Sequence, residues 1–161
     1  MKKTILLVLL TFSGAYQLVA QEIPAFKITD LNNQVFETNT LNNADNTVKV
    51  ISFWATWCIP CINELSNLND LSAVWKKDLK FDFFAISQDD SRTSKKVTSF
   101  VNGKGWEFNV LIDKNQDFKR LMNLPGVPYT IVAKNGKILY RHIGYAEGDE
   151  GVLYKIIKDN Q

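Results

Sequence analysis

The chain has 161 residues, 45% of them hydrophobic, and a formal net charge of +2. This length supports one domain with a sizeable core and is short for two. The near balance of charge gives no electrostatic ground for a nucleic-acid partner.

The first twenty residues, 1–20, have the pattern of a secretory signal peptide. Met1–Lys3 is basic, Ile5–Leu10 is apolar, and Leu18–Ala20 offers a cleavage site, with Ser13–Ala15 as a second candidate. The apolar stretch is short beside the roughly 20 residues of a spanning helix. Cleavage is therefore favoured, and an uncleaved membrane anchor is the alternative.

Cleavage after residue 20 would leave a single domain over residues 21–161. Removal of Lys2 and Lys3 reduces the 19 basic residues to 17, which equals the 17 acidic ones, so the remaining domain is neutral. We expect a periplasmic or otherwise exported location. Cysteines exported to such oxidising compartments tend to be used in disulfide bonds.

The N-terminal half of this domain alternates strand and helix patterns. Two short strands around a turn are predicted over 23–30 and 34–37. Val48–Trp54 is nearly all apolar, which is typical of a strand buried on both faces. Apolar residues at helical spacing then predict a helix with Lys76 and Lys77 in its last turn.

The C-terminal half continues in the same style. Its predicted elements are a strand over 81–86, a helix capped by Ser91 and ended by Gly103 and Gly105, a strand over 108–112, a short helix around 118–122, a hairpin of 129–133 and 138–142 with an Asn-Gly turn, and a helix over 152–157. The order predicts an α/β fold with a central mixed sheet flanked by helices. Open sheets of this kind place their sites where a central strand leads into a helix.

The only two cysteines, Cys58 and Cys61, stand at such a junction. A disulfide ring this small removes little unfolded-chain entropy, so the pair indicates redox chemistry rather than a structural staple. Cys58 is expected at the helix N-terminus, where the helix dipole lowers a thiol pKa and favours the attacking role. Cys61 would then resolve the mixed disulfide. Pro60 suits the first helical turn.

Metal binding is the other use of this cysteine spacing. A structural zinc site needs two further ligands, and the only histidine is His142. We interpret His142 as a structural or surface residue of the predicted hairpin. No metal and no other cofactor is expected.

The segment Phe53–Glu64 resembles the active-site segment of the thioredoxin superfamily, and more narrowly that of TlpA/ResA-like secreted thiol–disulfide oxidoreductases. The resemblance runs from about Ile23 to the end of the chain and includes an N-terminal β-hairpin and a helix–strand insertion between Gln88 and Ile112. It implies a thioredoxin-like fold. It also implies an exported enzyme that reduces or isomerises protein disulfides through a Cys58–Cys61 dithiol–disulfide cycle.

The resemblance also nominates residues around the pair. Pro128 matches a cis-proline that faces the two cysteines, and the backbone of Val127 just before it would pair with the substrate. Trp57 matches the aromatic residue that shields the pair and supports substrate docking, whereas we expect Trp54 to belong to the core.

Glu64 matches an acidic residue that ResA-like proteins hold near the cysteines. Thioredoxins themselves carry an aspartate on the preceding strand, where this chain has Ser52. A buried Glu64 would have a raised pKa and could exchange a proton with Cys61. The alternative is a first-turn glutamate that only stabilises the helix dipole.

Partners and alternatives follow from the same family. Protein disulfides are the expected substrates, apocytochrome c among them (cytochrome c biogenesis), and a membrane thiol reductant would recycle the pair. A copper-delivery module on this fold is one alternative, although it needs a wider cysteine spacing and a well-placed histidine. A thiol peroxidase is another, although the position of its threonine, three residues before the cysteine, is occupied by Ala55.

Overall fold

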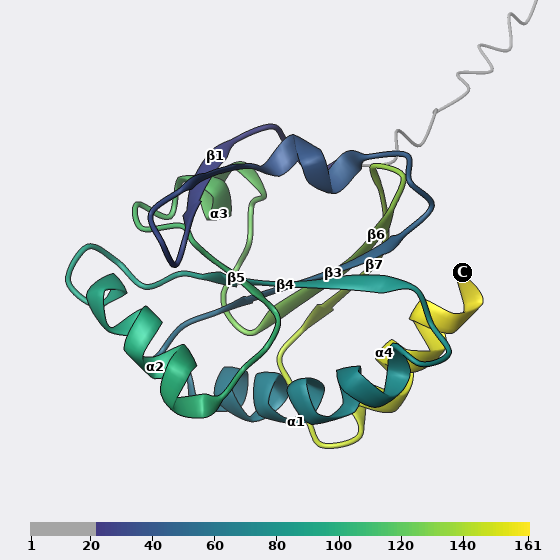
Figure 1. The fold of residues 1–161 in the computed structure, drawn as a ribbon. Helices are drawn as coiled ribbons and strands as arrows, with labels where there is room; N and C mark the ends of the chain where they lie inside the picture. The colour runs from purple at the N-terminus through teal and green to yellow at the C-terminus, as the bar shows by residue number, and fades with distance from the viewer. Residues whose placement is uncertain (1–21) are drawn as a thin grey trace, which may run out of the picture.

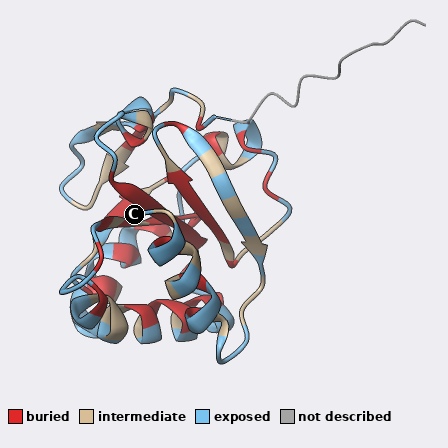
Figure 2. Cartoon of the chain, turned by 90° about the vertical axis from the view of Figure 1, so that its right-hand side faces the viewer, coloured by how far each residue is buried: buried red, intermediate tan, exposed pale blue. Residues whose placement is uncertain are grey.

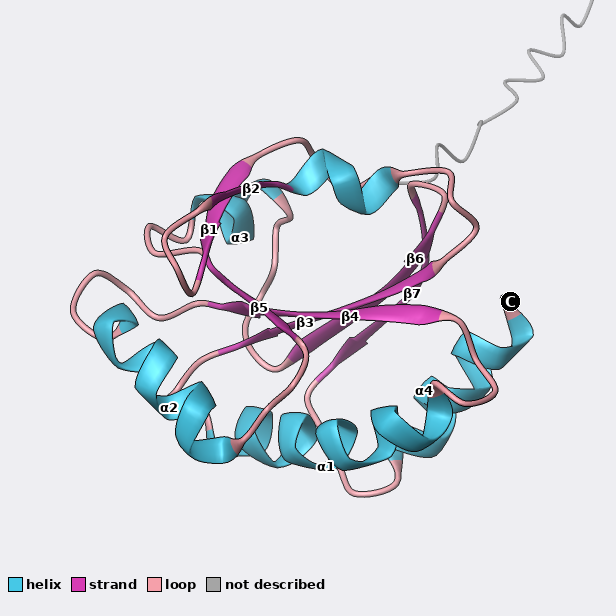
Figure 3. Cartoon of the chain, in the orientation of Figure 1, coloured by secondary structure: helices cyan, strands magenta, loops and turns pink. Residues whose placement is uncertain are grey.

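The computed structural model describes residues 22–161, so the predicted signal segment 1–20 lies outside the described residues. Seven strands form one mixed sheet in the order β2-β1-β5-β4-β3-β6-β7. Figures 1 and 3 show its helices distributed over both faces of this sheet. The elements are β1 (Lys27–Asp30), β2 (Val35–Glu37), η1 (Thr38–Asn42), β3 (Val48–Trp54), α1 (Ile59–Trp75), β4 (Phe81–Ser87), η2 (Ser94–Lys96), α2 (Val97–Lys104), β5 (Asn109–Ile112), α3 (Asp117–Leu121), β6 (Tyr129–Lys134), β7 (Lys137–Ile143) and α4 (Asp149–Asp159).

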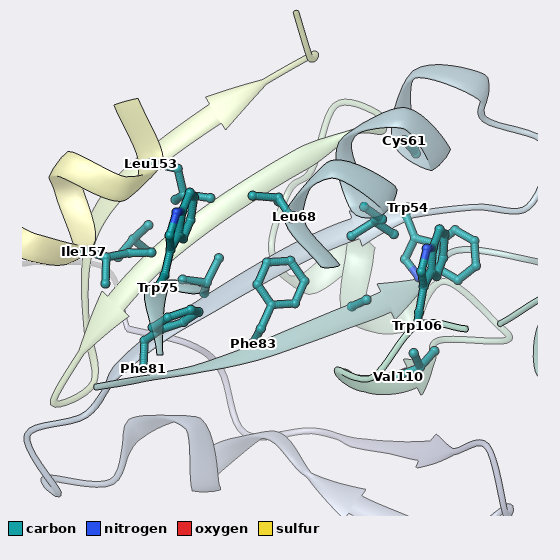
Figure 4. Close-up of a cluster of buried hydrophobic side chains, with 14 of the residues drawn as sticks. Trp54, Cys61, Leu68, Trp75, Phe81, Phe83, Trp106, Val110, Leu153 and Ile157 are labelled. Atoms are coloured by element: carbon teal, nitrogen blue, oxygen red, sulfur yellow. The ribbon is translucent and has the colours of Figure 1, made fainter. Parts of the chain in front are cut away.

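Helices α1, α2 and α4 cover one face of the sheet, while η1 and α3 lie on the other side (Figure 1). Each side has its own buried apolar cluster. Figure 4 shows the cluster beneath α1 and α4, in which Trp54, Cys61, Leu68 and Leu153 take part. The predicted central sheet flanked by helices is confirmed.

Strand β3 is the centre of the molecule, and all seven of its residues are buried. It runs parallel to β4 and antiparallel to β6. Because strand side chains alternate between faces, Val50 joins the cluster beneath α1, whereas Ile51 joins the opposite one. Figure 2 shows the central strands in red and the edge strand β7 in alternating tan and blue.

Trp54 is fully buried at the end of β3 and packs edge-on against Trp106, with 5.1 Å between ring centroids. Phe100 from α2 packs against the same tryptophan. The expectation that Trp54 is a core residue is confirmed. These contacts fix the point at which the chain leaves the sheet and begins the loop to the cysteines.

The hairpin prediction is also confirmed. Its turn residues Asn135 and Gly136 both have positive φ, at 49° and 79°, as a two-residue type I′ turn requires. Among residues 22–161, no helix is long and apolar enough to cross a membrane.

Two local predictions are wrong, and one short element was missed. Ser91 does not cap a helix: the Asp90 carboxylate accepts bonds from the backbone N–H groups of the next residues, and α2 begins only after η2, with Lys96 as its N-cap. This Asp90 turn satisfies the donors that a serine cap would have served. Lys76 is the C-cap of α1 and Lys77 follows it, so neither lies in the last turn. Segment η1 was not predicted at all.

Candidate functional site

Cys58 and Cys61 form a disulfide bond at the N-terminus of α1, with 5.3 Å between their Cα atoms. Cys58 is the N-cap, and its sulfur accepts a hydrogen bond of 3.3 Å from the backbone N–H of Cys61. Both residues are buried, but Cys58 keeps 5% of its surface exposed and Cys61 none. The positive end of the helix dipole and the free N–H groups of the first turn therefore point at the more accessible sulfur, that of Cys58.

The loop between β3 and α1 is held by a buried aspartate. Asp89 is fully buried, and its carboxylate accepts bonds from the backbone N–H of Thr56 at 2.9 Å and from the Thr56 hydroxyl at 2.6 Å. The hydroxyl of Ser87 donates to the same carboxylate. Sequence reasoning missed Asp89. An acidic residue just beyond the apolar strand 81–86 was the available signal.

Two exposed apolar side chains flank Cys58. Trp57 is 61% exposed and Ile59 is 71% exposed. The Val127–Pro128 peptide bond is cis, the isomer that the resemblance implies. Since Tyr129 is paired with Phe53 on β3, Val127 and Pro128 lie at the end of β3 from which the cysteine loop departs.

Glu64 is the sixth residue of α1 and only 5% exposed. Its carboxylate accepts hydrogen bonds from the hydroxyls of Thr130, at 2.7 Å, and Ser52, at 3.2 Å. Burial raises the pKa of Glu64 to about 7, against the opposing effect of these two bonds. The alternative of a first-turn glutamate that stabilises the helix dipole is wrong. This carboxyl group gains or loses a proton near neutral pH.

Ser52, Thr130 and His142 form a row across three strands. Ser52 on β3 is paired with Thr130 on β6, and Thr130 is paired with His142 on β7. Directly opposite residues point to the same side of a sheet, and in this sheet it is the side beneath Glu64. His142 is a partly exposed strand residue whose Nε2 lies 3.1 Å from a carboxylate oxygen of Asp149. The sequence did not predict that His142 pairs with Thr130, the residue that donates to Glu64.

Among residues 22–161, the structure contains no group of three or more histidine, cysteine, aspartate or glutamate side chains that could hold a metal ion. The site combines a disulfide, a helix N-terminus and a carboxyl group with a pKa of about 7.

Comparisons with known proteins agree with this geometry. The Redoxin family model matches residues 18–157. The thiol-disulfide oxidoreductase ResA of Bacillus thuringiensis (strain Al Hakam) is 32% identical over 141 residues, which cover 86% of this chain and 78% of the relative. The ResA of Bacillus anthracis gives the same values.

Solved structures show the same fold. An uncharacterized thioredoxin-like protein from Porphyromonas gingivalis is 36% identical with a TM-score of 0.73, covering 86% of this chain and 94% of that one. A putative thiol:disulfide interchange protein DsbE from Chlorobium tepidum is 25% identical with a TM-score of 0.75, covering 88% and 96%. The predicted thioredoxin-like fold is confirmed.

Proposed function

Because the chain belongs to the Redoxin family, we propose that Cys58 and Cys61 reduce or isomerise disulfide bonds of exported substrate proteins. The protein is a thiol–disulfide oxidoreductase, as its ResA relatives are. The observation that carries the proposal is the disulfide at the N-terminus of α1, with the buried carboxyl group of Glu64 three residues after Cys61 on the same helix. The family and this pair favour the oxidoreductase over the copper-delivery and peroxidase alternatives.

Cys58 is the attacking cysteine. In the reduced protein its thiolate is stabilised by the dipole and the N–H groups at the start of α1, which lowers its pKa. The thiolate attacks one sulfur of a substrate disulfide. A bond forms between Cys58 and that sulfur, the substrate disulfide breaks, and the second substrate sulfur leaves with the electron pair.

Cys61 resolves this mixed disulfide. It gives its proton to the Glu64 carboxylate, and the resulting thiolate attacks the Cys58 sulfur. The Cys58–Cys61 bond forms, and the first substrate sulfur leaves as a thiolate, so the substrate ends with two reduced sulfurs. A carboxyl group with a pKa of about 7 is suited to accept and return a proton at neutral pH.

Substrate docking is assigned to the surface around Cys58. The exposed Trp57 would contact the substrate segment, and the backbone of Val127 before Pro128 would pair with it. Apocytochrome c is the substrate class that the ResA resemblance suggests, with a membrane thiol reductant to recycle the pair. Segment 1–20 would act as the export signal to a periplasmic or similar compartment.

A trapping experiment tests the roles of the two cysteines. The Cys61→Ser variant cannot resolve the mixed disulfide, so it should retain substrate proteins on Cys58, and their identification names the pathway. Cys58→Ser is the matched control and should trap almost nothing. Equal trapping by both variants would refute Cys58 as the attacking cysteine and Cys61 as the resolving one.

The redox potential of the Cys58–Cys61 pair tests the direction of the reaction. The dipeptide between the cysteines, Ile59–Pro60, contains no histidine of the kind found in strongly oxidising relatives, and we therefore expect a reductant. Equilibration with glutathione should give a potential well below the roughly −120 mV of the most oxidising proteins of this type. A value near −120 mV would exclude the reductant role.

A further inference from the structure

Glu64 lines a small cavity that lies between α1, the edge of the sheet and α4. The cavity has a volume of about 20 Å³, and a cavity needs only about 10–15 Å³ to hold one water molecule. Its wall consists of Glu64, Leu68, Thr130, Tyr140, His142, Tyr145, Asp149, Glu150 and Leu153. Among the described residues, neither cysteine and none of the proposed docking residues contributes to this wall.

Within the cavity wall Glu64 is buried, whereas His142 is partly exposed. Adjacent strands are about 4.8 Å apart, so His142 on β7 lies one strand away from Thr130, which donates to Glu64. His142 and Asp149 keep 35% and 34% of their side chains exposed. The cavity therefore connects a buried carboxyl group to an imidazole that reaches solvent.

Asp149 fixes the imidazole. One of its carboxylate oxygens lies 3.1 Å from Nε2 of His142 and also accepts a 2.7 Å bond from the backbone N–H of Ala146. Tyr140 stacks on the His142 ring with 5° between the planes. The orientation of the imidazole beside the cavity is thus set from two sides.

The other titratable groups in the wall are poor proton carriers at neutral pH. Burial raises the pKa of Tyr145 to about 12 and also raises that of Tyr140, so both phenols stay protonated. Burial acts to raise the pKa of Glu150, but hydrogen bonds from Tyr145 and Asn67 hold it below the usual value. Glu150 therefore remains an ionised acceptor of those bonds.

We propose that His142, oriented by Asp149, is a positioning residue that relays the Glu64 proton between the cavity and solvent. The inference rests on the proposed function, in which Glu64 receives the proton of Cys61. Before Cys61 can give up its proton, protonated Glu64 passes its own proton through a cavity water to His142, which releases it to solvent, and the carboxylate formed in this way then accepts the Cys61 proton. When the disulfide is reduced again, a proton travels the reverse path. A substrate that covers Cys58 leaves this route open.

The reaction of the reduced full-length protein with 5,5′-dithiobis(2-nitrobenzoate) separates the two chemical steps. Attack by Cys58 releases one coloured thiolate, and resolution by Cys61 releases a second. In weak buffer at pH 7, His142→Ala should leave the first phase unchanged and slow the second by roughly tenfold, less than the 10²–10⁴ of direct proton transfer. Added imidazole, which can enter the enlarged cavity, should restore the second phase.

Matched variants exclude a merely structural effect. His142→Gln retains the size and a hydrogen bond toward Asp149 but cannot relay a proton, so it should be slow and should gain little from imidazole. Ile143→Ala, on the opposite face of β7 and 56% exposed in the native protein, should match the wild type. An unaltered second phase in His142→Ala, or a slow one that imidazole does not restore, would overturn the relay.

Different results would refute the proton relay and the proposed function. Cys61→Ser should abolish the second phase and Glu64→Gln should slow it. If those results hold while His142→Ala behaves as the wild type, only the relay is refuted. If Cys61→Ser still releases the second thiolate, the proposed function itself is refuted.

Discussion

Thr130 on β6 donates a 2.7 Å hydrogen bond to the carboxylate of Glu64 on α1. The bond ties the active-site helix to the sheet through a buried carboxyl group of that helix. Burial raises the pKa of Glu64 to about 7, and the bond from Thr130 is the largest influence in the opposite direction. The proton affinity of Glu64 is therefore set by a balance between burial and a side chain that lies 66 residues away in sequence.

Replacing Thr130 by valine removes this donor without much change in volume. Because the bond stabilises the ionised carboxylate, Thr130→Val should raise the Glu64 pKa above its value of about 7. The carboxyl ¹³C shift of Glu64, followed by NMR from pH 4 to pH 9, measures the change. Thr130→Ser keeps a hydroxyl and should titrate like the wild type. Identical curves for all three proteins would show that the bond does not control the pKa.

The raised Glu64 pKa makes stability depend on pH. An unfolded glutamate ionises near 4.5, whereas folded Glu64 keeps its proton up to about pH 7. Between these values the folded state binds more protons, so the free energy of unfolding falls as pH rises, by up to roughly 3 kcal/mol at about 1.4 kcal/mol per pKa unit.

Urea unfolding of the oxidised protein between pH 4 and pH 8 checks this expectation. The wild type should lose stability relative to Glu64→Gln across that window, and the loss should level off above pH 7. Parallel stability curves for the two proteins would contradict the buried, protonated state of Glu64.

Asp89 should be essential for the loop that carries the cysteines. Asp89→Ala leaves the buried Ser87 hydroxyl and the half-buried Thr56 N–H without their acceptor, and an unsatisfied buried donor costs about 1–3 kcal/mol. We expect a loss of stability in that range and a slower first phase with the aromatic disulfide, both measured on the purified variant. Asp70→Ala, on the exposed side of α1, is the control and should change neither.

Replacing Trp57 by alanine should weaken the reaction with protein substrates only. Its side chain is 61% exposed, so Trp57→Ala should change the unfolding free energy by less than about 0.5 kcal/mol. An exposed aromatic anchor of an interface contributes about 2 kcal/mol or more, which predicts a KM for a disulfide-bonded protein substrate raised roughly thirtyfold.

The reaction with a small aromatic disulfide should stay close to normal in Trp57→Ala, because that compound needs no docking surface. Val74→Ala removes a similarly exposed apolar side chain (56%) from the far end of α1 and should leave both reactions unchanged. Equal KM values for the protein substrate in wild type and Trp57→Ala would remove Trp57 from the docking surface.

Features that depend on neighbouring residues were predictable from the sequence. The all-apolar run of β3, the helical spacing after Cys61 and the turn at Asn135–Gly136 each encode a local conformation, and each was found where expected. The cysteine pair at the strand–helix junction belongs to the same class. Its placement at a helix N-terminus follows from chain order alone.

Where the local signal was ambiguous, the sequence predicted the wrong hydrogen-bond acceptor. Ser91 and Asp90 are adjacent residues that can both accept bonds from free N–H groups, and only the folded turn shows that Asp90 does so. A carboxylate accepts two such bonds at once and therefore displaces the weaker cap.

The environment of the cysteines was decided by tertiary structure. Ser52, Thr130 and His142 come from three strands, and only the sheet register aligns them beneath Glu64. Asp149 reaches His142 because α4 packs back against the sheet. The sequence by itself thus determined the redox pair, whose chemistry needs two neighbouring thiols. The fold determined the proton chemistry, because a carboxyl pKa depends on burial and on partners that are remote along the chain.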